Sequence, residues 1–290
     1  MKIIIPMAGA GNRFVEKKYD LPKPLIFVNK RRIVEYLLDS FSEEDEIVFI
    51  CNDKHLRNTY MKDILKKLRP NSEIISMPQH KYGPVYTVQK AYEYIKDDEE
   101  VIVCYCDVPF IWSFDKFKKH IKDNKLDGCV LTHTGFHPHS LNSTKMAFLK
   151  VQDNLMLEIK EKECYTFDHL QEHASSGLYY FNKGKYIKKY FDKLVEKNIN
   201  YNGEYYVTLV YNLLVQDSLR VGYYDTEFVT VFGTPEEVES FEAWNTILKN
   251  GQVKNAEDLI KIYEYWKKYH DLGLNNPCKN LLVQDGGKGI

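Results

Sequence analysis

The residues best suited to chemistry lie near the start of the chain, in a turn that follows a short apolar run. Residues 3–5 are typical of a buried parallel strand. The turn consists of Met7, Ala8, Gly9, Ala10, Gly11 and Asn12. Successive backbone N–H groups in such a turn form a concave anion site, and glycine lets a phosphate approach the main chain. Arg13 and Lys23 add two cations, so the segment suggests binding of a nucleoside triphosphate.

The same turn departs from two common phosphate-binding motifs. A dinucleotide fingerprint needs a third glycine, where this chain has Phe14. A P-loop needs a Gly-Lys-Ser/Thr step, and none follows. Because a strand followed by Gly-x-Gly also occurs in ordinary βα connections, other segments have to decide the function.

Strand and helix patterns alternate through the first 132 residues. Strands are expected at 46–51, 73–77, 100–106 and 128–132, and helices at 32–41, 56–68, 84–95 and 114–124. The alternation predicts an α/β fold with a doubly wound, Rossmann-like, mostly parallel sheet. Ligands of such sheets bind beyond the carboxyl ends of the strands. The glycine turn, Gly83 and Asp107 all follow strand ends, so each could face one cleft.

From about residue 133 the strands no longer alternate one by one with helices along the chain. Strands at 146–151, 155–160, 177–181, 220–224 and 227–232 suggest a small antiparallel extension, with helices at 183–197, 205–216, 235–250 and 255–269. We expect one main domain over residues 1–245, a C-terminal helix packed on it over 246–270, and a flexible tail over 271–290.

The composition of the chain argues against non-specific binding to nucleic acids or membranes. A chain of 290 residues that is 44% hydrophobic can bury a full core, and a net charge of −1 provides no field for non-specific nucleic-acid or membrane binding. No leader-like segment or run of about 18 apolar residues is present, which predicts a cytoplasmic protein without a membrane partner. No pair of cysteines forms a CxxC motif, and all are expected to be reduced thiols: Cys51, Cys104, Cys106, Cys129, Cys164 and Cys278.

The segment from Gly9 to Phe14, followed by Pro-Lys-Pro-Leu-Ile around Lys23, resembles the signature of the nucleotidyltransferases (pyrophosphorylases) that make nucleotide-activated sugars and phospho-alcohols. The resemblance covers residues 1 to about 245 and implies a GT-A-like fold. It implies that the glycine turn and Arg13 hold the triphosphate and that Lys23 contacts the reacting phosphates. It also implies that Asp107 holds Mg²⁺, and that Gln79 and Gly83 lie beside the base.

Three later segments resemble acceptor-pocket elements of the same family. Residues 158–162 resemble its V-x-E-K stretch, whose lysine binds the acceptor phosphate; Lys162 matches, and Lys160 is the register-shifted alternative. Residues 175–181 resemble a segment that lines the acceptor pocket. Residues 202–207 resemble the G-E-F-Y-V element of the capsule and surface-polysaccharide branch. The acceptor-binding candidates are therefore Lys162, Ser176, Gly177, Glu204 and Tyr206.

One position departs from the family pattern. Residues 233–237 match its G-T-P-E-D/E helix start, but Val231 stands where most relatives carry a second metal-binding aspartate. The ion would then be held by Asp107 with phosphates and water, or with Asp225 or Glu204 as a second ligand.

His133, His137 and His139 could suggest a zinc site. Their spacing, with Pro138 between the last two, suits a loop better than one helix face, and no matching Cys/Asp cluster lies nearby. We therefore do not expect a structural zinc ion.

The expected function is an Mg²⁺-dependent transfer of NMP from an NTP to a sugar or polyol phosphate, with release of pyrophosphate, to make a surface-polysaccharide precursor. Arg13, Lys23, Asp107 and Lys162 would carry the reaction. The first alternative is a CTP-dependent cytidylyltransferase for a phosphorylated amino-alcohol or amino compound. More distant are a GT-A glycosyltransferase, which usually needs an Asp-x-Asp motif that residues 104–107 lack, and a non-catalytic nucleotide-sugar-binding protein. No nucleic-acid partner is expected, and a homodimer is left open.

Overall fold

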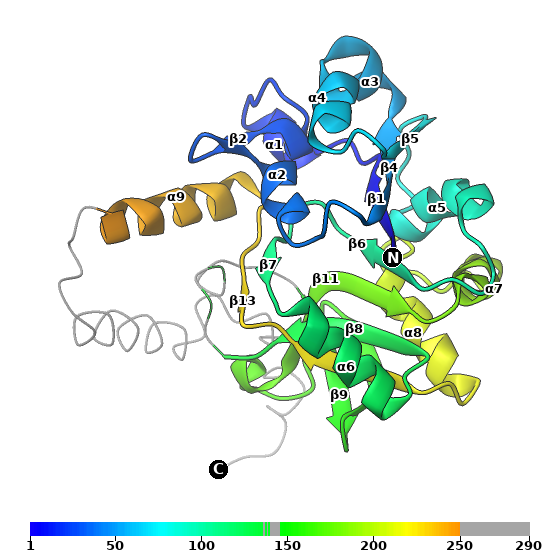
Figure 1. Cartoon of the computed structure of the whole chain (residues 1–290). Coiled ribbons are helices and arrows are strands. Elements are labelled where there is room, and N and C mark those ends of the chain that lie inside the picture. The colour runs from blue at the N-terminus through cyan, green and yellow to red at the C-terminus, as the bar shows by residue number, and fades with distance from the viewer. Residues whose placement is uncertain (136, 138, 140–145, 250–290) are drawn as a thin grey trace.

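The computed structural model describes residues 1–135, 137, 139 and 146–249. Its main sheet has nine strands in the order β5-β4-β1-β6-β11-β8-β12-β10-β9 (Figure 1). The strands are β1 (Lys2–Met7), β4 (Glu46–Asn52), β5 (Glu73–Met77), β6 (Val101–Cys104), β8 (Gly128–His133), β9 (Ala147–Gln152), β10 (Leu155–Glu161), β11 (His173–Phe181) and β12 (Val221–Asp225). Two short pairs lie outside it: β2 (Phe27–Val28) with β3 (Arg31–Arg32), and β7 (Phe110–Ile111) with β13 (Phe228–Val229).

One half of the sheet has only parallel pairings, and the other half is mostly antiparallel. Strands β5, β4, β1 and β6 pair in parallel, as does β8 with β12. Strand β11 is antiparallel to β6, β8 and β9, and β10 is antiparallel to β9 and β12. The sheet is therefore mixed, which corrects the prediction of a mostly parallel sheet with a small antiparallel extension. The difference arises because β11 stands antiparallel between β6 and β8, within the sheet and not at its edge.

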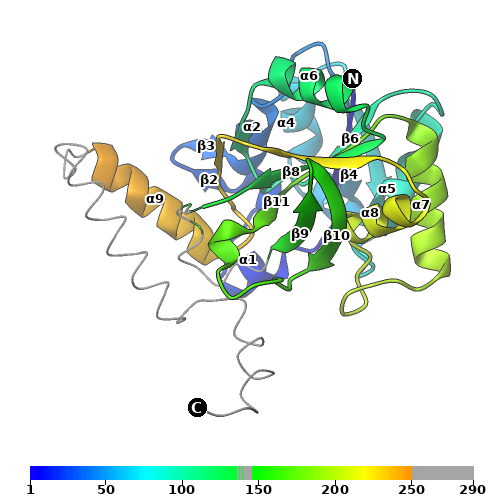
Figure 2. The same cartoon turned by 90° about the horizontal axis from the view of Figure 1, so that it is seen from below.

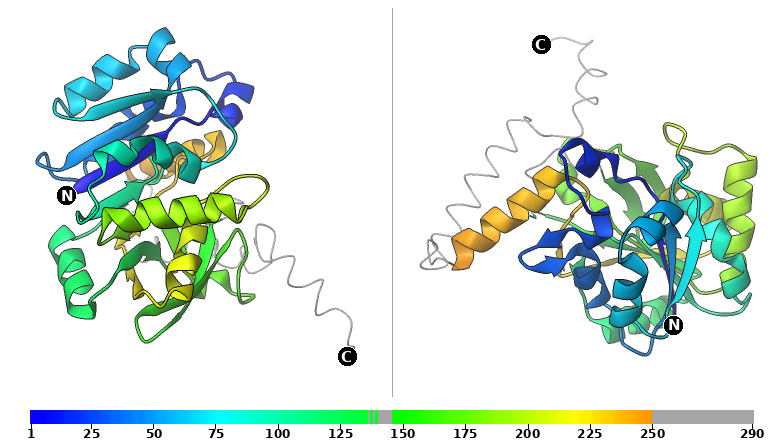
Figure 3. Two further views of the ribbon diagram at one scale, coloured as in Figure 1. Left: turned by 90° about the vertical axis from the view of Figure 1, so that its right-hand side faces the viewer. Right: turned by 90° about the horizontal axis from the view of Figure 1, so that it is seen from above.

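Helices cover both faces of the sheet, as the doubly wound prediction requires (Figure 3). Apolar side chains of α5 (Pro84–Val88), α7 (Gly184–Glu196) and α8 (Val207–Gln216) pack on one face. Those of α2 (Ile33–Leu38), α4 (Met61–Leu68) and α6 (Phe114–Asn124) pack on the other. Strand residues alternate between these two cores, since successive side chains of a strand point to opposite faces.

Two predicted helices are divided in the structure. The predicted helix 56–68 is divided into α3 (Asp53–Asn58) and α4, separated at Thr59, whose hydroxyl accepts the Met61 N–H. The segment 84–95 is α5 followed by the 3₁₀ helix η2 (Gln89–Tyr94). The other short helices are α1 (Asn12–Glu16), η1 (Lys23–Leu25) and η4 (His169–Gln171).

Helix α9 (Pro235–Lys249) projects from the side of the molecule that carries α1 and β2 (Figures 1 and 2). Its first turns pack Val238 and Phe241 against Phe14 and Phe232. The predicted helix at 255–269 and the predicted tail at 271–290 lie outside the described residues.

The cysteines agree only in part with the expectation of reduced thiols. Cys51, Cys104, Cys106 and Cys129 are free and buried. Cys164 is disulfide-bonded, which corrects that expectation, and Cys278 lies outside the described residues. In the part of the chain that the structure describes, no helix combines the length and apolar character needed to cross a bilayer.

Candidate active site

Two neighbouring cavities lie beyond the ends of β1 and β6. The first cavity has a volume of about 620 Å³ and the second cavity about 750 Å³. They share a wall, because four residues line both of them: Tyr105, Asp107, Asn202 and Tyr206. Two ligands bound in these cavities would therefore meet at Asp107.

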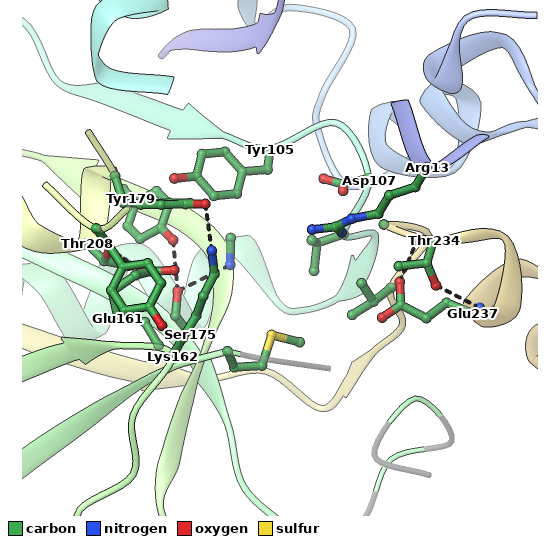
Figure 4. A pocket seen from close by; sticks show the side chains of 18 of the residues that line it. Arg13, Tyr105, Asp107, Glu161, Lys162, Ser175, Tyr179, Thr208, Thr234 and Glu237 are labelled. Atoms are coloured by element: carbon green, nitrogen blue, oxygen red, sulfur yellow. Dashed lines mark hydrogen bonds between the residues drawn. The ribbon is translucent and has the colours of Figure 1, made fainter. Parts of the chain in front are cut away.

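The first cavity gathers nine of the ten residues predicted to bind a nucleotide: Met7, Ala8, Gly9, Ala10, Gly11, Asn12, Lys23, Gln79 and Gly83. The backbone amides of residues 9–11 donate to no other group among the described residues, so they are available to an anion. Arg13 differs from the prediction. It follows the turn in α1, but its side chain lines the second cavity instead (Figure 4).

Lys23 and Asp107 form an ion pair at the shared wall. Lys23 begins η1 after Pro22, Asp107 follows β6, and Lys23 Nζ lies 2.5 Å from Asp107 Oδ2. The side chains are 23% and 18% exposed. Burial alone would lower the pKa of Lys23, but the carboxylate of Asp107 and then the Cys106 thiol raise it, and the pKa lies above its ordinary value. Lys23 is therefore a cation at neutral pH.

Lys162 lies on the opposite side of the second cavity from Arg13 (Figure 4). Its backbone has a φ of 60° directly after the end of β10. Its Nζ donates to the Tyr206 hydroxyl at 2.7 Å and lies 4.4 and 4.9 Å from the ring centres of Tyr206 and Tyr201. Lys160, the alternative, places its ammonium over Tyr165 and lines neither cavity.

Glu161 is a cavity residue that sequence reasoning missed. Its side chain faces the second cavity although the residue is only 8% exposed, and it accepts a hydrogen bond from Thr208 Oγ1 at 2.5 Å. Burial raises the pKa of Glu161 above its ordinary value. The signal was present in the sequence, because Glu161 falls two residues after the buried Ile159 and therefore on the same side of β10.

Hydroxyl groups surround Glu161 (Figure 4). Ser175 Oγ lies 3.0 Å from the Tyr179 hydroxyl, and Tyr105 and Thr208 line the same wall. Several hydroxyls beside one carboxylate suit a ligand that carries several hydroxyl groups.

Three predicted acceptor or metal residues are placed differently. Ser176 is buried on the other face of β11, where its hydroxyl and His133 Nδ1 lie 2.9 Å apart, so Ser175 lines the cavity instead. Asp225 accepts hydrogen bonds from Thr132 Oγ1 and His173 Nδ1 and lines neither cavity. Glu204 lines the first cavity and not the second, and it accepts from the Tyr206 hydroxyl at 2.8 Å. The other acceptor candidates, Gly177 and Tyr206, line the second cavity.

The start of α9 brings a further carboxylate, that of Glu237, to the second cavity. Thr234 N donates to Glu237 Oε2 at 2.9 Å and Glu237 N donates to Thr234 Oγ1 at 3.2 Å, a capping box that fixes the helix start. A Cβ placed on Gly233 would lie 3.1 Å from Glu237 Oε2 and 3.3 Å from Asp107 Oδ2. Glycine therefore lets the chain pass between the two carboxylates. Val231, at the departing position, also lines the second cavity.

His133, His137 and His139 pack together, with ring centres 4.8 to 5.6 Å apart. Burial lowers the pKa of all three, and that of His139 falls to about 3, so their rings are neutral at neutral pH. Within residues 1–135, 137, 139 and 146–249, no three His, Cys, Asp or Glu residues form a group able to hold a metal ion.

Gly83 allows the loop beside Gln79 to contact the segment before α8. A Cβ on Gly83 would lie 2.8 and 2.9 Å from the Tyr205 backbone N and O, and Gly83 has a φ of 84°. We expect Gly83→Ala to destabilise the protein by about 2–4 kcal/mol, because positive φ and overpacking add. Gly203→Ala is the matched control, since φ is 81° there but no atom lies within 4 Å. Equal losses in denaturant unfolding would contradict the steric argument.

Comparison with known proteins matches residues 3–162 to the family described as the MobA-like NTP transferase domain. The match covers more than half of the chain. The chain belongs to this family. The matched residues of the MobA-like domain run from the glycine turn through Lys23 and Asp107 to Lys162, and thus include residues of both cavities.

The chain is also similar to curated relatives of greater length. It is 28% identical over 231 residues to the bifunctional protein GlmU of Clostridioides difficile, covering 76% of this chain and 46% of the relative. It is 26% identical over 247 residues to the GlmU protein of Staphylococcus epidermidis, covering 83% and 51%. The MobA-like chain thus spans about half the length of the curated relatives it matches.

Solved structures share the fold. A nucleoside-diphosphate-sugar pyrophosphorylase from Vibrio cholerae superposes with a TM-score of 0.68 at 21% identity, covering 83% of this chain and 99% of that one. The inositol-1-phosphate CTP transferase from T. maritima gives 0.61 at 15% identity, covering 82% and 94%. These structures place the MobA-like domain in a Rossmann-like α/β fold common to nucleotidyltransferases.

Proposed function

We propose that this chain is an Mg²⁺-dependent nucleotidyltransferase that transfers NMP from an NTP to a sugar or polyol phosphate and releases pyrophosphate. The observation that carries the proposal is the ion pair of Lys23 and Asp107 on the wall between the two cavities. An NTP in the first cavity and a phosphorylated acceptor in the second would bring their reacting phosphates to this wall. The product would be an activated precursor of the kind used for surface polysaccharides.

The first cavity supplies groups for the triphosphate. The amides of residues 9–11 are available to an anion, and Lys23 is held as a cation where the α-phosphorus would lie. Gln79 and Gly83 line the same cavity, where amide and backbone groups can bind a base edge. Because an acceptor phosphate can displace pyrophosphate directly, these residues act by positioning and charge stabilisation.

The residues beside Lys23 fit a magnesium ion. Asp107 offers a carboxylate at the shared wall, and hard oxygen ligands are those that Mg²⁺ prefers. Glu204 in the first cavity and Glu237 in the second are candidates for a further ligand, in place of Val231. When bound, the ion would neutralise phosphate charge.

The second cavity supplies groups for the acceptor. Arg13 and Lys162 are cations on opposite sides of it, and either can bind the attacking phosphate. Glu161 and the hydroxyls of Ser175 and Tyr179 lie on the Lys162 side, where they can bind the hydroxyls of a sugar or polyol.

A phosphorylated amino-alcohol is the second candidate acceptor, and one observation favours it. The ammonium of Lys162 lies over the rings of Tyr201 and Tyr206, so these rings can hold a cation. We rank the amino-alcohol phosphate second for two reasons. Lys162 itself occupies the position over the two rings, and the second cavity is lined by more hydroxyl than carboxylate side chains.

The deciding experiment is pyrophosphate release. The purified chain, with Mg²⁺, is incubated with each NTP against a panel of sugar, polyol and amino-alcohol phosphates. We expect release with one NTP and one acceptor class only when both substrates and Mg²⁺ are present. Binding of nucleotide sugars without release from any combination would favour a non-catalytic binding protein.

Glu161→Gln separates the two acceptor classes. A glutamine still hydrogen-bonds hydroxyls, so for a sugar or polyol phosphate we expect the acceptor KM to rise by about tenfold or less. For an amino-alcohol phosphate we expect a loss of about two orders of magnitude in kcat/KM, because a buried cation loses its partner. Glu236→Gln is the control, since Glu236 lines the same cavity but is 54% exposed and pairs with Lys17.

A further inference from the structure

We propose that Lys23 masks Asp107 in the substrate-free protein, so that Asp107 becomes a cation ligand only when phosphates draw Lys23 away. The proposal rests on the proposed function in one respect, the assignment of Asp107 to the metal. Lys23 Nζ already lies 2.5 Å from Asp107 Oδ2, within the space that a metal ion on this oxygen would need.

The pair is shielded from solvent more than a typical surface ion pair. With Lys23 at 23% and Asp107 at 18% exposure, water screens their attraction only in part. Asp107 forms no other ion pair within the described residues, and neither does Lys23. Each is therefore the neutralising partner of the other.

Separating Lys23 from Asp107 is unfavourable unless an anion takes the place of the carboxylate beside Lys23. A divalent cation on Asp107 would leave the Lys23 ammonium without its carboxylate in a partly buried position. The positive charge of Arg13, which also lowers the pKa of Lys23, lies near enough to repel that ammonium. Metal alone therefore has to displace a cation and leave it unpaired.

Nucleotide phosphates remove this penalty. The amides of residues 9–11 and Lys23 line the same cavity, so a triphosphate held by the turn offers Lys23 an anion in exchange for Asp107. Asp107 is then free to bind the cation that accompanies the phosphates. Every charge keeps a partner through the exchange, which predicts that metal and nucleotide bind cooperatively and that free metal binds weakly.

The test measures Mn²⁺ alone binding to the substrate-free full chain, by electron paramagnetic resonance or calorimetry. We expect Lys23→Met and Lys23→Gln to bind Mn²⁺ at least about tenfold more tightly than wild type. Glutamine retains a hydrogen-bond donor for Asp107, so it keeps the test available if the methionine variant folds poorly. Adding Asp107→Asn to Lys23→Gln should abolish the gain.

Lys162→Met is the matched control. It removes one positive charge from the neighbouring cavity, but Lys162 is held by Tyr206 and Tyr201 and not by Asp107. We expect its Mn²⁺ affinity to stay within about twofold of wild type. Equal gains in Lys162→Met and Lys23→Gln would show a general charge effect and overturn the proposal, as would unchanged Mn²⁺ binding in both Lys23 variants.

This outcome is independent of the reaction. Absence of pyrophosphate release from wild type would defeat the proposed function while leaving the Mn²⁺ comparison interpretable. Unchanged Mn²⁺ affinity in an active enzyme would defeat the masking proposal alone.

Discussion

Replacement of Lys23 by alanine is expected to lower kcat/KM for pyrophosphate release by about 10²–10³, the effect of losing one charge-stabilising group at a reacting phosphate. Lys23 lies at the wall shared by the two cavities, and its pairing with Asp107 keeps it cationic. Because its charge acts mainly where phosphate charge develops, kcat should fall more than the NTP KM rises. Steady-state kinetics with the preferred substrate pair measures both quantities.

Lys160→Ala is the matched control for this lysine. It removes the same charge from a residue that lines neither cavity, so its kcat/KM should stay within about threefold of wild type. Near-normal activity of Lys23→Ala, or an equal loss in Lys160→Ala, would remove Lys23 from the proposed mechanism.

Asp107→Asn is expected to abolish most metal-dependent activity, with a loss of at least about 10² in kcat, because the amide keeps the shape but not the anion. It also leaves Lys23 without its carboxylate. Since the pair is partly exposed, we expect a stability loss of only about 1–3 kcal/mol. The protein should therefore remain folded, as circular dichroism and denaturant unfolding would show.

Asp225→Asn is the matched control, because Asp225 bonds Thr132 and His173 and lines neither cavity. It should cost stability without changing the Mg²⁺ concentration that gives half-maximal rate. The metal site would have to be relocated if Asp107→Asn were nearly neutral and Asp225→Asn or Glu204→Gln were severe.

The residues of the first cavity show how much of the site can be predicted from sequence patterns. The glycine turn, Gly83 and Asp107 come from three distant segments, yet each follows a strand of the parallel half of the sheet. Carboxyl ends of parallel strands meet at one edge, so the strand pattern was enough to place these residues together. Lys23 belongs to the same cavity; its charge near the turn suggested phosphate binding, and the resemblance to a known family gave it a role at the reacting phosphates.

The second cavity was less predictable, because its residues come from helix starts, loops and the antiparallel strands β9, β10 and β11. Whether a strand side chain points into this cavity depends on the register of the strand and on how side chains alternate between its two faces. Ser175, Gly177 and Tyr179 line the cavity while Ser176 faces His133 on the other side of β11. The matching motif named the segment, but of its two serines only Ser175 lines the cavity.

The sequence by itself determined the doubly wound helices and the anion-binding turn, because local periodicity and strand ends specify them. The roles of the candidate lysine and aspartate came from the resemblance to a known family. Tertiary structure alone decided that Arg13 lines the second cavity and that Asp225 lies away from both cavities. The physical reason is that side-chain direction follows from strand pairing. The insertion of β11 antiparallel between β6 and β8 brings together residues whose separation in the sequence carries no periodic signal.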